Sequence, residues 1–212
     1  MRMALALAAV AVAPAAPPPP NVAHLVLQPE QVGKGYVMQV ANGGKGVKAQ
    51  ATLNLCGTDY PSEGFRSTRL QATYRKSGSA TQISNEVVTY RAGAAVQAMR
   101  EALQHAVGCP NKPIATGVAG LPKLKFTITR ITDPKLLKGY LAVQVVVTGT
   151  VKGKHILQTS YAVYQRLGSV LSGVYSFLGT SESQRALCLH AAEQSARNLR
   201  RGTSGVSSGP TA

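Results

Sequence analysis

Arginine and tyrosine side chains recur together in two stretches of this 212-residue chain. A guanidinium binds carboxylate or phosphate through paired hydrogen bonds, and a tyrosine adds stacking surface and a hydroxyl group. The combination is typical of sites that bind anions. The candidate ligand-binding residues are Tyr60, Arg66, Arg69 and Tyr74 in the first stretch and Tyr164 and Arg166, next to Tyr161 and Gln165, in the second. In the alternative reading, internal carboxylates such as Glu63 and Glu86 satisfy the arginines while the tyrosines cover the edge of the core.

Residues for catalysis or for binding a metal are sparse. The chain has 8 Asp+Glu against 23 Lys+Arg, and both carboxylate-pair catalysis and hard-cation sites need several convergent acids. None of the 4 histidines has a second ligand at metal-binding spacing, and no G-x-S-x-G motif occurs. We therefore predict a protein that is not an enzyme, with no catalytic residue, no metal and no cofactor. A small secreted hydrolase built from distant segments is an alternative.

The net charge of +15 favours anionic partners. We expect the ligand to be an unknown small molecule or an anionic component of the cell envelope, with a protein partner as a further option. A basic protein that binds polyanions or nucleic acid through its charge is the second alternative, and nucleic acid is the less favoured partner of the two.

The ends of the chain predict export. Residues 1–16 combine a basic start, an apolar run too short to cross a bilayer and small residues for cleavage, which are the marks of a signal peptide. A proline-rich spacer is expected over residues 17–24, one domain over 25–201 and a disordered tail over 202–212. The mature protein is then secreted and extracellular, at the cell envelope, with no transmembrane segment.

Export places the three cysteines in an oxidising compartment, where disulfides persist. Cys56 and Cys109 each sit where a strand or helix gives way to a loop, so we pair them. Cys188 lies within the expected C-terminal helix, on its buried side. The spacing of the cysteines contains no C-x-x-C motif, which argues against zinc and against thioredoxin-like redox chemistry.

The elements that must position these residues centre on residues 140–177. Leu141, Val143, Val145 and Val147 alternate with more polar neighbours, so they predict a strand with one buried face. Strands over 155–166 and 170–177 continue an antiparallel meander, and a helix that begins at Ser181 and stops at Gly202 follows it. Further strands are expected over 36–40, 69–76, 82–90 and 124–131, and a second helix over 91–107.

Several short segments resemble a known actinobacterial group. They include Cys56-Gly57, Tyr60-Pro61-Ser62-Glu63, Ser84-Asn85-Glu86-Val87-Val88-Thr89-Tyr90, Gly108-Cys109-Pro110, Val163-Tyr164-Gln165-Arg166 and Val170-Leu171-Ser172-Gly173-Val174-Tyr175. Over roughly 25–200 the chain resembles secreted or lipid-anchored proteins similar to the extracellular sensor domain of the mycobacterial receptor kinase PknH.

The resemblance implies a fold and a role. The fold is α+β: a twisted antiparallel β-sheet with helices packed on it, in a single disulfide-braced domain with a cleft. The role is non-enzymatic ligand binding or sensing at the cell envelope. No kinase or transmembrane segment is present in the sequence given, so any signalling must pass through a partner. Three cysteines also cannot supply the two disulfides of the relatives.

Overall fold

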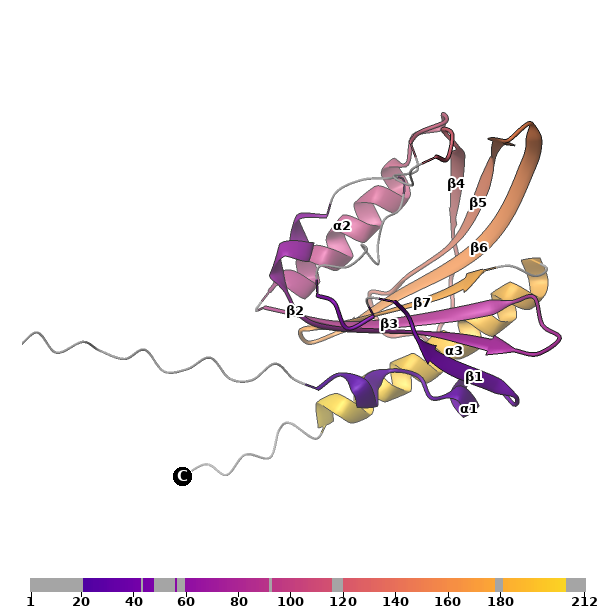
Figure 1. Cartoon of the computed structure of the whole chain (residues 1–212). Coiled ribbons are helices and arrows are strands. Elements are labelled where there is room, and N and C mark those ends of the chain that lie inside the picture. The colour runs from indigo at the N-terminus through magenta and orange to yellow at the C-terminus, as the bar shows by residue number, and fades with distance from the viewer. Residues whose placement is uncertain are drawn as a thin grey trace, which may run out of the picture.

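One seven-stranded antiparallel sheet, with a long helix on each face, forms the body of the protein (Figure 1). The computed structural model describes residues 21–42, 44–47, 56, 60–91, 93–115, 120–177 and 181–204. The strands are β1 Tyr36–Val40, β2 Arg66–Lys76, β3 Gln82–Tyr90, β4 Lys125–Arg130, β5 Leu141–Val151, β6 Lys154–Leu167 and β7 Val170–Phe177, in the spatial order β1-β2-β3-β7-β6-β5-β4. The helices are α1 Pro29–Val32, α2 Ala94–Gly108 and α3 Ser181–Ser204, with 3₁₀ helices η1 Ala23–Leu25 and η2 Pro61–Phe65. The expected α+β fold is confirmed.

The predicted meander is present as β5, β6 and β7, which pair antiparallel in sequence order. Lys152 and Gly153 form the turn between β5 and β6 with φ angles of 50° and 75°. A left-handed conformation at both central residues matches the twist of the strands it joins. The meander continues through β3 to β2 and β1, so the strands that carry most of the arginine and tyrosine candidates belong to one sheet.

The two faces of the sheet have cores of different character. On the face covered by α3, Cys188, Ala191 and Ala192 pack against buried strand residues such as Val163 and Val174. On the other face, α2 presents a row of alanines at helical spacing, Ala94, Ala95, Ala98, Ala102 and Ala106. These small side chains lie against the rings of Tyr60, Tyr90, Tyr164 and Tyr175. Aromatic residues from the sheet and alanines from the helix therefore fill the α2 side.

Both long helices differ from expectation at one end. The sequence predicts a start for α2 at Arg91, but α2 begins at Ala94, after Gly93 in a left-handed conformation with φ of 79°. The expected stop of α3 at Gly202 is wrong, because the helix continues to Ser204. A Cβ atom at position 202 would lie 2.3 Å from Cδ2 of Leu25. The glycine thus allows η1 to approach the end of α3 rather than ending the helix.

The N-terminal part of the described chain is packed. Val22 is buried in the same cluster as Leu25 and Leu27, so ordered packing starts within the stretch that was expected to be a spacer. Asn198 on α3 donates to the carbonyl oxygen of Leu25 at 3.4 Å and exchanges hydrogen bonds with Gln31. These contacts hold the first elements against the last helix. Within the described ranges, none of the helices has the length and apolar character needed to span a membrane.

The cysteines follow the prediction. Cys56 and Cys109 form a disulfide with Cα atoms 5.7 Å apart. Cys188 is a free, fully buried thiol on the inner side of α3, within 3.7 Å of the carbonyl oxygens of Tyr161 and Val174. Desolvation raises the pKa of the Cys188 thiol to about 12, more than hydrogen bonding to Ser176 lowers it.

Because only the thiolate is a good nucleophile, the Cys188 thiol is expected to resist modification in the folded protein. Ellman's reagent at neutral pH should find no reactive thiol under native conditions and one per chain after unfolding without reductant. Rapid labelling of the native protein would show that the α3 side of the core opens more readily than the structure indicates.

Candidate functional site

The predicted arginines of β2 lie in a buried polar cluster beneath α2. The side chains of Arg69 and Glu86 form an ion pair and are 2% and 0% exposed. Arg69 also donates to the side-chain oxygen of Gln71 at 2.5 Å. Arg66 donates to Glu63 at 3.1 Å, with its own side chain 1% exposed. Internal carboxylates therefore bind both guanidinium groups, as the alternative reading of the sequence expected.

The residues around Arg66 keep its guanidinium group positively charged. Burial lowers the pKa of Arg66, but Tyr90, Glu86 and Glu63 together raise it by more, so the net shift is upward. Desolvation raises the pKa of Glu63, and the guanidinium of Arg66 lowers it by less. Arg66 is therefore a permanent buried charge that these neighbours stabilise.

A third carboxylate ties α2 to this cluster. Glu101 on α2 accepts hydrogen bonds from the backbone N–H and the hydroxyl of Ser62 in η2, at 3.2 and 2.5 Å. Gln97, one turn earlier on α2, donates to Glu101 at 2.7 Å. The polar cluster thus joins η2, α2 and the β2–β3 hairpin, which gives Glu63, Glu86 and Glu101 a structural role.

The structure brings together five of the six predicted ligand-binding residues on the α2 side and separates the sixth. Tyr60 packs edge-on against His105, with ring centroids 4.7 Å apart, and Tyr164 packs edge-on against Tyr175 at 5.6 Å. Arg166 lies on the same sheet face as Tyr164, two residues along β6, and donates to the carbonyl oxygen of Gly168 at 2.8 Å. Tyr74 lies on the opposite face, where its hydroxyl donates to the carbonyl oxygen of Leu27 at 2.5 Å. Ligand binding by these residues stays a prediction.

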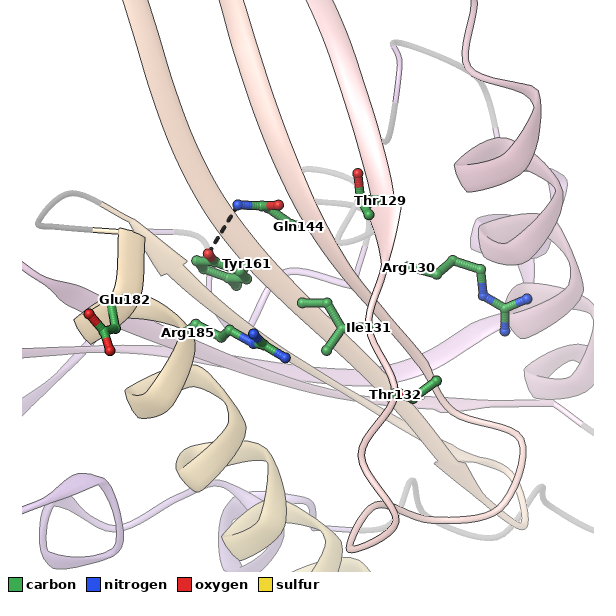
Figure 2. Close-up of a pocket in the computed structure, with 8 residues that line it drawn as sticks. All are labelled: Thr129, Arg130, Ile131, Thr132, Gln144, Tyr161, Glu182 and Arg185. Carbon is green, nitrogen blue, oxygen red and sulfur yellow. Dashed lines mark hydrogen bonds between the residues drawn. The ribbon is translucent and has the colours of Figure 1, made fainter.

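A cavity of about 640 Å³ opens on the α3 side, between the start of α3 and the strands β4 to β6 (Figure 2). Its lining residues come from four elements and the chain that follows β4. They are Thr129, Arg130, Ile131, Thr132, Gln144, Tyr161, Glu182 and Arg185. The register of the sheet explains why the lining residues of β4, β5 and β6 lie together, because Thr129 pairs with Gln144 and Gln144 pairs with Tyr161. Directly paired residues point to the same side of an antiparallel sheet.

Polar groups line this cavity. The amide of Gln144 donates to the hydroxyl of Tyr161 at 3.1 Å, and Tyr161 is buried at 5% exposure. Arg185 is exposed and extends from the first turns of α3 toward β4, whereas Arg130 points away from the other lining side chains (Figure 2). The positive end of the α3 dipole also lies near the cavity, since Glu182 and Arg185 belong to its first turns. The cavity can offer an anion a guanidinium, hydroxyl groups and an amide.

The sequence indicates only part of this cavity. Tyr161 stands beside the candidate residues of β6, but strand alternation separates it from Tyr164 and Arg166, which face the other way. Gln144 and Arg185 carried no local signal, and the Thr127-Ile128-Thr129 alternation on β4 was the one available hint. The cavity has a single carboxylate among its lining residues, and over the described ranges no three His, Cys, Asp or Glu side chains gather as metal ligands.

Comparison with known proteins gives a distant structural likeness and no family. Neither a protein-family model nor a curated protein matches the chain. The chain is similar to the crystal structure of the extracellular domain of PknH from Mycobacterium tuberculosis, with a TM-score of 0.49 and 9% sequence identity. The match covers 82% of this chain and 93% of that one. Nothing about the ligand of this chain follows from a likeness at this level.

Proposed function

We propose that this protein is an exported, non-enzymatic domain that binds an anionic ligand in the cavity between α3 and β4–β6. The observation that carries the proposal is the cavity itself: Arg185 and the Gln144–Tyr161 pair line one space of about 640 Å³. That volume lies within the range of small-molecule sites, which combine a concave shape with a few convergent polar groups. The net charge of +15 draws anions toward the whole surface.

The lining chemistry favours binding over catalysis. General acid–base chemistry needs a positioned proton donor or acceptor, and covalent chemistry needs an activated nucleophile next to a base. Among the lining residues that the structure describes, Glu182 is the only carboxylate, and it is exposed to solvent at the start of α3. These described residues include no histidine or cysteine. The hydrolase alternative would therefore need residues from outside this cavity.

Export rests on the disulfide and on the leader-like sequence of residues 1–16. The Cys56–Cys109 disulfide is of a kind that persists in oxidising compartments and is rare in reducing ones. An extracellular domain at the cell envelope would meet anionic polymers and their soluble fragments. These are the ligands that the charge of the protein favours.

Replacing Arg185 by alanine is expected to abolish retention of the ligand. The guanidinium of Arg185 is the main permanent positive charge directed into the cavity. A hydrogen bond to a charged group contributes about 1.5–3 kcal/mol, or roughly 10–150-fold in affinity. The measurement is native mass spectrometry of protein purified from its own host, compared with the denatured mass. Wild type should carry an additional mass that denaturation removes, and Arg185→Ala should not.

Arg201→Ala is the matched control, because Arg201 is an exposed arginine on the same helix but lies outside the cavity. It removes the same charge and should keep the additional mass. A wild-type protein without additional mass, or equal loss in both variants, would contradict the proposed site. The denatured mass also tests export, since removal of residues 1–16 is visible in it.

A further inference from the structure

We infer that the binding site extends from the cavity along the open face of strands β4, β5 and β6, and that this face binds an acidic polysaccharide. The inference rests on the proposed function, because the cavity would hold one acidic unit at the end of the chain. We call the surface the threonine face. It is made by Lys125, Thr127, Thr148, Thr150 and Thr159, with Thr129 at the boundary of the cavity.

Register places these side chains in successive rows on one side of the sheet. Thr129, Gln144 and Tyr161 form the row that lines the cavity, Thr127, Val146 and Thr159 form the next, and Lys125, Thr148 and Leu157 form the third. Thr150 pairs with His155 in a fourth row near the β5–β6 turn. Because side chains on one face recur every second residue, the rows lie about 7 Å apart. The rows form a continuous surface that begins at the cavity.

Helix α3 does not cover the threonine face. That helix packs on β6 and β7 near the cavity, where the Cys188 thiol approaches the Tyr161 carbonyl oxygen. In Figure 1, β4, β5 and β6 rise well past α3 toward the β5–β6 turn, and α2 lies on the other side of them. Thr127 and Thr150 are exposed, and Leu157 is 76% exposed. The rows above the cavity are therefore accessible to a ligand.

These three strands carry basic side chains and no acidic ones. Residues 124–132 and 141–167 contain Lys125, Arg130, Lys152, Lys154 and Arg166 but no Asp or Glu. Strand alternation directs Arg130, Lys154 and Arg166 to the other face, so the cations of the threonine face are Lys125 in the third row and Lys152 at the turn beyond the fourth. A polymer with a negative charge on each unit would meet these lysines toward the β5–β6 turn and Arg185 at the cavity, with no carboxylate on the rows between them.

The side chains on this face match hydroxyl-rich units better than nucleotide bases. A threonine hydroxyl donates one hydrogen bond and accepts others, which suits sugar hydroxyls. Binding of single-stranded nucleic acid relies on exposed aromatic rings on which bases stack. In the rows named above, Tyr161 is buried at 5% exposure, which leaves the imidazole of His155 in the fourth row as the exposed ring. Leu157 offers an apolar contact to the carbon face of a sugar ring.

The test compares a galacturonate monomer, a short oligogalacturonate, a neutral dextran oligomer and a single-stranded DNA oligonucleotide of matched charge. The variant Thr127→Val/Thr148→Val/Thr159→Val removes three hydroxyls and keeps β-branched shapes that suit strands. All three positions lie outside the residues that line the cavity. Thr73→Val on β2, at the other end of the sheet, is the control.

Wild type should bind the oligogalacturonate at least about tenfold more tightly than the monomer, and the triple variant should lose most of this gain, since each net hydrogen bond contributes about 0.5–1.5 kcal/mol. Thr73→Val should bind as wild type does. Equal binding of the oligomer by wild type and triple variant, no binding of the oligomer, or equal binding of DNA or dextran would overturn the inference. The proposed function fails separately if Arg185→Ala leaves binding of the monomer unchanged.

Discussion

Replacing Arg69 by alanine is expected to lower the free energy of unfolding by about 3–5 kcal/mol, because it removes the partner of a buried carboxylate. The Glu86 side chain is 0% exposed, and its ion pair with Arg69 lies between α2 and the sheet. Removing one member of a buried pair leaves a charge that water cannot solvate. The measurement is urea unfolding followed by circular dichroism, with the midpoint and slope fitted for wild type and variant.

Two further variants separate the buried ion pair from ordinary loss of a side chain. Arg75→Ala lies on the same strand but is exposed, so it should change the free energy of unfolding by less than about 0.5 kcal/mol. The double variant Arg69→Met/Glu86→Gln removes both charges and should be more stable than Arg69→Ala alone. If Arg69→Ala costs no more than Arg75→Ala, the buried ion pair contributes little and the cluster is better solvated than the structure shows.

Loss of the disulfide is the second large effect. In Cys56→Ser/Cys109→Ser the free energy of unfolding should fall by about 4 kcal/mol, the value that loop-closure entropy gives for a loop of this length. The two cysteines are 53 residues apart, and the loop they close contains η2, β2, β3 and α2. Without the disulfide the unfolded chain gains conformational freedom over this whole region. Thermal unfolding in the presence and absence of reductant measures the effect.

Reductant itself provides the control for the disulfide variant. Dithiothreitol should destabilise the wild-type protein to about the level of the variant, and it should have no further effect on the variant. Cys188 is buried and already reduced in both. An unchanged midpoint on reduction of wild type would mean that the region from Cys56 to Cys109 retains its structure without the covalent link.

Much of the fold could be predicted because its signals are local. The alternation of Leu141, Val143 and Val145 predicts a strand with one buried face, and the structure places all three residues in the core on the α2 side. The failures came where a distant contact outweighs a local preference. Gly202 reads as a helix stop, yet its missing side chain makes room for Leu25, which lies at the other end of the chain. A single sequence without register or packing holds no sign of that contact.

The candidate site was less predictable than the fold. Its residues lie on four elements, and only strand register brings Thr129, Gln144 and Tyr161 into one row. The presence of arginine and tyrosine residues is a fair guide to anion binding, but the residue type does not reveal whether a given side chain is exposed or buried. Arg69 contacts a buried carboxylate on the sheet face covered by α2, whereas Arg185 lies at the start of α3 and lines a cavity. The sequence alone does not show which face of the sheet each helix covers.

The contact between Gly202 and Leu25 also determines how the domain can be mounted. It brings the first and last packed segments together, at the far side of the molecule from the turn at Lys152 and Gly153 (Figure 1). A fluorophore, a surface linker or a fused protein attached at either end would therefore leave the β5–β6 turn pointing away from the attachment. Immobilised through one end, the domain would present the β5–β6 hairpin to the surrounding solution, which is the orientation that a capture reagent or biosensor requires.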